Sequence, residues 1–255
     1  MRERAMFLAA AMAFWAYPAS GQDWAKEKLD KSPRHGEYVQ LKHRDRTLQA
    51  FVVYPEVSQK ATAVVVIHEI YGLTDWARLA ADELAAAGYI AIAPDLVGPH
   101  EGENVMQAVR RLPPKQVLAD LDAAADYIKS QPAANGKLAV AGFCWGGAES
   151  FAFATHRKDL SAACVFYGFA PDEKAMSKIA CPVYGFYAQN DARITLTVPE
   201  TEKLMRQARK KYDVVIYAGA GHGFMRAGED PKPSAANRDA RDGAWKRLKE
   251  ILAKL

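Results

Sequence analysis

The sequence has few cysteines and little net charge. It contains three cysteines in 255 residues and carries a formal charge of +4. Cys144, Cys164 and Cys181 show neither a Cys-x-x-Cys pair nor metal-ligand spacing, so no metal centre is predicted and a thiol-redox role ranks last. The charges are scattered, which argues against a nucleic-acid surface. We therefore expect a small molecule as the partner, without a cofactor or a nucleic acid.

No apolar run is long enough to span a membrane comfortably. The run at 5–17 follows two arginines and precedes small residues at 19–21, which is the pattern of a secretory signal peptide. We expect cleavage after residue 21, or after residue 20, and no stable membrane insertion afterwards. The alternative is an uncleaved anchor or an amphipathic leader. No long linker interrupts residues 22–255, so they are predicted to form a single domain, periplasmic or secreted.

Apolar segments alternate with amphipathic ones along the rest of the chain. Strands are predicted over 38–41, 48–54, 61–67, 89–93, 138–143, 162–167, 180–187 and 213–217, and helices over 76–87, 105–111, 117–130, 199–211 and from 238 onward. The first two strands are expected at an edge, antiparallel to each other. The remaining alternation predicts an α/β fold with a mainly parallel sheet and helices on both faces. Cys164 and Cys181 fall on neighbouring buried strands, where free thiols are common, although a disulfide between them stays open.

The stretch Leu138–Gly147 ends an apolar strand in the pattern Gly-x-Cys-x-Gly-Gly, and good helix formers follow it. Strand, sharp turn and helix match the nucleophile elbow of α/β-hydrolases, with cysteine where serine is usual. Gly142 and Gly146 have no Cβ to clash where the strand and the helix approach each other. Cys144 would lie at a helix N-terminus, a position that favours a thiolate in general. The alternative is a buried cysteine at an ordinary turn.

Two further residues complete a candidate catalytic triad. Asp191 and His222 each follow a predicted strand, and the order nucleophile, acid, histidine is that of α/β-hydrolases. Cys144 would attack a carbonyl, His222 would transfer the proton, and Asp191 would orient the imidazole. A surface histidine and a turn-forming aspartate are the alternatives for the last two. The joint pattern, with each residue just past a strand, favours the triad.

The loop after the strand at 61–67 supplies further candidates. The backbone N–H groups of Ile70 and Trp145 are placed to form an oxyanion hole, since one follows this strand and the other follows the nucleophile. Glu69 is an acid at the end of an apolar strand and is a candidate to exchange a proton with the thiol. The alternative is a solvated glutamate or an ion pair with an arginine. His68 and Glu69 lack the second histidine of a zinc-protease helix.

At this point the sequence resembles the dienelactone hydrolase family. The matching segments are His68–Gly72, Ala93–Leu96, Asn135–Lys137, Gly142–Gly147, Asp191 and Ala220–Phe224. The resemblance implies an α/β-hydrolase with a triad of Cys144, Asp191 and His222, and a role for Glu69 in switching the thiol to a thiolate when substrate binds. It also implies hydrolysis of carboxylic esters or lactones without metal or cofactor.

The chain departs from the pattern of the namesake enzymes in two places. Those enzymes hold a substrate carboxylate with two arginines, of which Arg226 matches one, whereas the region of the other reads Glu-Gly-Glu-Asn at 101–104. The predicted signal peptide is the second departure, because the namesake pathway is cytoplasmic. We expect a monomeric exported hydrolase of a small ester or lactone. The alternatives are a general short-chain carboxylesterase and a non-catalytic binding protein of the same fold.

Overall fold

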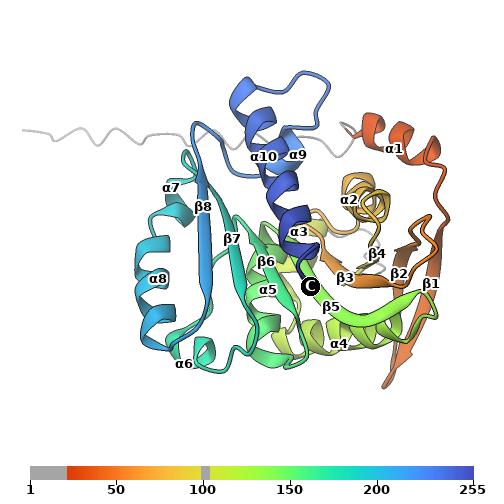
Figure 1. Cartoon of the computed structure of the whole chain (residues 1–255), viewed down its shortest axis with the longest axis horizontal. Helices are drawn as coiled ribbons and strands as arrows, with labels where there is room; N and C mark the ends of the chain where they lie inside the picture. Colours follow the sequence, from red (N-terminus) through yellow and green to blue (C-terminus); the bar gives the residue numbers. More distant parts are fainter. Residues whose placement is uncertain (1–21, 99–103) are drawn as a thin grey trace, which may run out of the picture.

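The computed structural model describes residues 22–98 and 104–255, so the predicted signal peptide at 1–21 lies outside the described residues. In this part of the chain, eight strands form one sheet in the order β1-β2-β4-β3-β5-β6-β7-β8 (Figure 1). The pairs β1–β2 and β2–β4 are antiparallel, and the other neighbouring pairs are parallel. This confirms the predicted α/β fold with a mainly parallel sheet.

The strands follow the apolar segments of the sequence closely. Three of the parallel strands, β3, β4 and β6, are buried along their whole length, because helices cover both faces of the sheet there. The bounds are β1 (Gly36–His43), β2 (Arg46–Val53), β3 (Ala61–Ile67), β4 (Ile90–Pro94), β5 (Ala134–Phe143), β6 (Ala162–Phe166), β7 (Val183–Ala188) and β8 (Tyr212–Tyr217).

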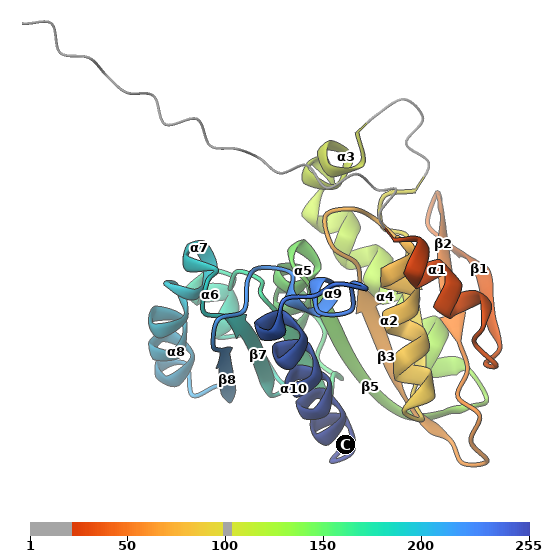
Figure 2. The same ribbon diagram turned by 90° about the horizontal axis from the view of Figure 1, so that it is seen from above.

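The helices cover the two faces of this sheet. The described helices are α1 (Asp23–Asp30), α2 (Asp75–Ala86), α3 (Val105–Arg111), α4 (Pro114–Ser130), α5 (Trp145–His156), α6 (Glu173–Met176), α7 (Ala192–Thr195), α8 (Val198–Gln207), α9 (Phe224–Ala227) and α10 (Ala235–Leu252). Seen from above, α8 lies at one end of the molecule, and α1 and β1 lie at the other (Figure 2). Among these residues, no helix is long and apolar enough to cross a membrane.

Two apolar clusters form the core, one on each face of the sheet. Trp76 of α2 and Leu248 of α10 belong to one cluster, and Leu121 of α4, Phe151 of α5 and Met205 of α8 belong to the other. The two clusters fix the helices on opposite faces of the sheet. The carboxyl ends of the parallel strands lie together at one end of the sheet, and ligands of open α/β sheets bind at that end.

Some predicted positions were wrong. The first two strands do lie at one edge and pair antiparallel, as predicted, but only β1 is the outermost strand, because β2 lies between β1 and β4. The other edge strand is β8. The helix predicted to continue to Lys211 ends at Gln207, and Arg209 then takes a left-handed conformation with φ of 56°. The helices α6, α7 and α9 were not predicted. Each has four residues, which is too short to show a helical period.

Candidate active site

Cys144 occupies a strained turn between β5 and α5. Its backbone has φ of 58° and ψ of −115°, in a region that non-glycine residues rarely adopt, and it is the N-cap of α5. A Cβ added to Gly142 would lie 1.8 Å from the carbonyl oxygen of Gly146, and one added to Gly146 would lie 2.4 Å from the carbonyl oxygens of Ile67 and His68. The predicted reason for both glycines is confirmed: strand and helix approach too closely for any side chain.

The structure brings the three triad residues together. The Nε2 atom of His222 lies 3.0 Å from the Sγ atom of Cys144, and the Nδ1 atom lies 2.5 Å from the Oδ2 atom of Asp191. Asp191 follows β7 and is buried, while the ring of His222 is a third exposed. A sulfur atom, an imidazole and a buried carboxylate in line are the arrangement that nucleophilic catalysis requires.

The environment of His222 favours its charged form. Burial of the ring opposes protonation, because an imidazolium loses hydration there. The hydrogen bonds to Asp191 and Cys144, together with the charges of these groups, outweigh burial and raise the pKa of His222 to about 10. The raised pKa favours the imidazolium form, which can donate a proton to a neighbouring atom.

The loop that carries His222 is anchored on two sides. The backbone N–H of Gly221 donates to the side-chain oxygen of Asn237 on α10 at 2.9 Å, and the N–H of Asn190 donates to the carbonyl of Ala220 at 2.9 Å. The ring of Tyr167 also meets His222 edge to face, with 5.1 Å between centroids. These contacts hold the imidazole between the ends of β5 and β7. Sequence reasoning missed Asn237 and Tyr167.

Ile70 and Trp145 lie where oxyanion donors are expected. Ile70 follows the carboxyl end of β3, Trp145 is the first residue of α5, and β3 pairs directly with β5. Within residues 22–98 and 104–255, neither backbone N–H donates a hydrogen bond. Both donors are therefore available to an oxygen atom bound beside Cys144.

Glu69 lies beside this site but contacts an arginine. Its buried carboxylate accepts hydrogen bonds from Nε of Arg226 at 2.7 Å and from the hydroxyl of Tyr167 at 3.4 Å. The guanidinium of Arg226 also lies over the ring of Tyr71, 5.3 Å from its centroid. The charge of Glu69 raises the pKa of Arg226 above its usual range. The ion pair that the sequence left as an alternative is thus present, and the thiol contacts His222 instead.

Comparison with known proteins places this chain in a family. The signature described as "Dienelactone hydrolase family" matches residues 48–255, most of the chain. The chain belongs to the dienelactone hydrolase family. Relatives from Salmonella typhi and Methylorubrum extorquens, both named "Putative carboxymethylenebutenolidase", are 31% and 30% identical. The matches cover 81% of this chain and 82% of the first relative, and 83% of this chain and 78% of the second.

A solved structure of the family has the same fold. It is described as a "Putative Dienelactone Hydrolase" from Klebsiella pneumoniae and superimposes with a TM-score of 0.77 at 26% identity. The superposition covers 87% of this chain and 99% of the other. Together with the family match, this makes the protein a dienelactone hydrolase-like hydrolase with an α/β-hydrolase fold.

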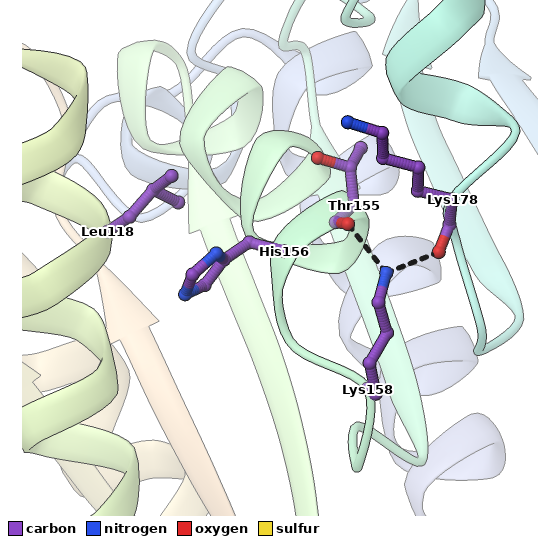
Figure 3. A pocket seen from close by; sticks show the side chains of 5 residues that line it. All are labelled: Leu118, Thr155, His156, Lys158 and Lys178. Atoms are coloured by element: carbon purple, nitrogen blue, oxygen red, sulfur yellow. Dashed lines mark hydrogen bonds between the residues drawn. The ribbon is translucent and has the colours of Figure 1, made fainter.

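A separate surface pocket of this protein lies far from the triad. Its lining includes Leu118 of α4, His156 at the carboxyl end of α5, and Lys158 (Figure 3). Cys144 precedes the other end of α5, about 18 Å from His156 at 1.5 Å per helical residue. The Lys158 ammonium donates to the carbonyls of Thr155 and Lys178 at 2.7 Å and 2.5 Å. The pocket therefore has no part in the candidate active site. No group of three potential metal ligands occurs in the described part of the chain.

Proposed function

We propose that this protein hydrolyses a small carboxylic ester or lactone through a cysteine nucleophile and an acyl-thioester intermediate. One observation carries the proposal: His222 links the Sγ atom of Cys144, at 3.0 Å, to the buried carboxylate of Asp191, at 2.5 Å. The family match supports the reaction class, and the free N–H groups of Ile70 and Trp145 support an acyl-transfer reaction in particular.

Acylation begins with the proton on His222. The sulfur of Cys144, paired with the imidazolium, attacks the carbonyl carbon, and the carbonyl oxygen becomes an oxyanion that accepts hydrogen bonds from Ile70 and Trp145. The tetrahedral intermediate then expels the alkoxide. His222 donates its proton to this leaving oxygen, which frees the alcohol and leaves the acyl group on sulfur.

Deacylation uses the same groups in the opposite protonation state. The neutral His222 accepts a proton from a water molecule while that water attacks the thioester carbon. The oxyanion hole again holds the negative charge. Collapse of the intermediate breaks the bond between carbon and sulfur, which releases the carboxylic acid and regenerates the thiolate of Cys144. Asp191 keeps the imidazole oriented and stabilises its charge in both steps. In a lactone, the alcohol and the acid remain one molecule.

Arg226 bears on the choice of substrate. Its side chain is 22% exposed and matches one of the two arginines of the namesake enzymes, which favours a substrate carboxylate. Its charge is compensated by Glu69 at 2.7 Å, so the pair attracts an anion less than a free arginine does. This ion pair favours the second candidate, a short-chain carboxylesterase without a carboxylate preference. The two candidates share one mechanism and differ in substrate.

Hydrolysis of two substrates distinguishes the candidates. A dienelactone, which carries a carboxylate, and the neutral p-nitrophenyl acetate are each assayed with and without iodoacetamide, which alkylates a reactive thiol. Thiol-sensitive turnover that favours the dienelactone supports the lactonase. Thiol-sensitive turnover of the acetate alone supports the general esterase. Turnover that survives complete alkylation of Cys144 contradicts the mechanism for both.

We also propose that the protein is exported and acts as a monomer. The basis for export is the pattern of arginines, apolar residues and small residues over 1–21. Expression of the full chain in a Gram-negative host, followed by fractionation and N-terminal sequencing, is expected to give periplasmic protein that begins at residue 22 or 21. Light scattering of the mature protein tests the monomer. A cytoplasmic, uncleaved product would contradict export.

A further inference from the structure

His68 is a buried histidine between the two residues that supply the oxyanion donors. It follows β3 and is fully buried. Its Nδ1 atom lies 2.7 Å from the carbonyl oxygen of Glu69. Its ring stacks on the indole of Trp145, with 5.4 Å between centroids and 24° between planes. One side chain therefore contacts the backbone before Ile70 and the side chain of Trp145.

The hydrogen bond from His68 fixes one peptide group. A carbonyl oxygen can only accept, so the ring proton is on Nδ1. The Glu69 carbonyl and the Ile70 N–H belong to the same trans peptide group, so the two point in opposite directions. The carbonyl also accepts from the N–H of Gly72 at 3.2 Å. Two donors on this oxygen hold the peptide plane and polarise its N–H on the other side.

The stacked ring fixes the second donor relative to the first. The start of α5 already presses on the end of β3, since a Cβ on Gly146 would lie 2.4 Å from the carbonyl oxygen of His68. The imidazole fills the space beside that contact and packs flat on Trp145. The ring of His68 therefore also contacts the residue that carries the second donor.

The second nitrogen of His68 shows that packing alone does not account for a histidine here. The Nε2 atom is buried and has no hydrogen-bond partner within residues 22–98 and 104–255. Burial lowers the pKa of His68, so the ring is neutral and Nε2 is an unpaired acceptor. An unpaired buried acceptor costs free energy that an apolar ring would not. The contribution that distinguishes histidine from phenylalanine is the hydrogen bond from Nδ1.

We propose that His68 is a positioning residue that sets the oxyanion hole by orienting the Glu69–Ile70 peptide and packing on Trp145. The inference rests on the proposed function, because an oxyanion hole acts only in a reaction that forms an oxyanion. It predicts a loss in the chemical step and no loss in substrate binding. It also predicts no loss in reactions of Cys144 that create no oxyanion.

Two substitutions separate the hydrogen bond from the packing. His68→Phe keeps a flat ring against Trp145 and removes the donor. His68→Asn loses the ring but places an amide nitrogen where Nδ1 was, at the same number of bonds from the backbone. Removal of a whole oxyanion donor costs about 10²–10³-fold in kcat. Loss of its orientation is expected to cost His68→Phe about 10–100-fold. His68→Asn keeps the donor and loses only the packing on Trp145, so its loss of kcat is expected to be clearly smaller than that of His68→Phe.

The control reaction is alkylation of Cys144 by iodoacetamide, in which sulfur bonds to the methylene carbon and iodide leaves. No oxyanion forms, so the alkylation rate and KM are expected to be unchanged in both variants. Equal losses of kcat and alkylation rate in His68→Phe would show a merely structural role and overturn the inference. An asparagine variant as impaired as the phenylalanine variant would also overturn it. If His68→Phe does not fold, His68→Ala replaces it as the donor-free variant.

The proposed function and this inference fail in different ways. A wild type that is alkylated at Cys144 but hydrolyses neither the dienelactone nor p-nitrophenyl acetate overturns the proposed function, and the inference with it. A wild type that hydrolyses an ester, with a phenylalanine variant of equal kcat, overturns the inference alone. Circular dichroism of each variant confirms that the compared proteins are folded.

Discussion

Two neighbouring strands of the sheet carry a cysteine in opposite environments. Cys144 follows β5 on a turn with φ of 58°, partly exposed and 3.0 Å from the imidazole of His222. Cys164 lies in the middle of β6, fully buried, where burial raises the pKa of its thiol to about 12. The two strands pair in parallel. The same side chain, one strand apart, is thus a candidate nucleophile in one place and an inert core residue in the other.

The difference shows that position at the end of a strand decides the chemistry. A residue inside a parallel strand faces a helix layer and is desolvated. A residue just past the carboxyl end faces the loops that follow other parallel strands. Here the loops after β8 and β7 supply His222 and, behind it, Asp191. The strained backbone of Cys144 holds the sulfur toward those groups. Cysteine is reactive only where structure provides both access and a partner.

Removal of each sulfur is expected to have the largest effect. Cys144→Ala should abolish turnover, a loss of at least about 10³-fold, because no other group can form the acyl intermediate. Cys164→Ala removes a sulfur of the same size but should retain kcat within about two-fold. Steady-state hydrolysis of p-nitrophenyl acetate by both variants makes the comparison. Retained turnover in Cys144→Ala would contradict the mechanism.

Replacement of the Asp191 carboxylate tests whether His222, the partner of Cys144, depends on Asp191. Asp191→Asn keeps the shape but removes the charge and is expected to lower kcat by about 10²–10⁴-fold. Asp213→Asn, an exposed carboxylate paired with Arg247, is the matched control and should have no effect on kcat. An Asp191→Asn enzyme within three-fold of the wild type would show that His222 acts without the acid.

The triad was predictable because each member is marked locally. Cys144 lies between glycines that a close approach requires, and Asp191 and His222 each follow an apolar strand. Parallel strands bring their carboxyl ends to one edge whatever the details of packing.

The surroundings of the triad were less predictable because they depend on long-range packing. The ion pair of Glu69 with Arg226 joins residues 157 positions apart, so the sequence left it as one alternative among several. Tyr167 was expected to be the last residue of its strand, and only its left-handed backbone, with φ of 40°, turns its hydroxyl toward Glu69. A search that includes the last residue of each predicted parallel strand would have found Tyr167.

The pH dependence of turnover sharpens the comparison further. His222 has its pKa raised to about 10, so its protonated form is present below that value and is lost as the pH rises through it. We expect kcat/KM to fall on the alkaline side near pH 10. Asp191→Asn removes one cause of the shift and should move this fall to lower pH. Turnover of an alkyl ester is followed by pH-stat, because such an ester hydrolyses slowly on its own. If the fall in kcat/KM occurs at the same pH in Asp191→Asn as in the wild type, its assignment to His222 is contradicted.

The smallest expected effect is on stability. The difference in the free energy of unfolding between a glycine and an alanine variant is expected to have opposite signs at positions 144 and 164. At position 144, glycine should be more stable than alanine by about 1 kcal/mol, because a non-glycine residue pays strain at this φ and ψ. At position 164, glycine should be less stable than alanine by about 1 kcal/mol, because the residue lies inside a strand. Each kcal/mol corresponds to about 2–4 °C in Tm for a chain of this size. Melting curves of the four variants measure both differences, and equal signs would show that the turn at Cys144 stores no strain.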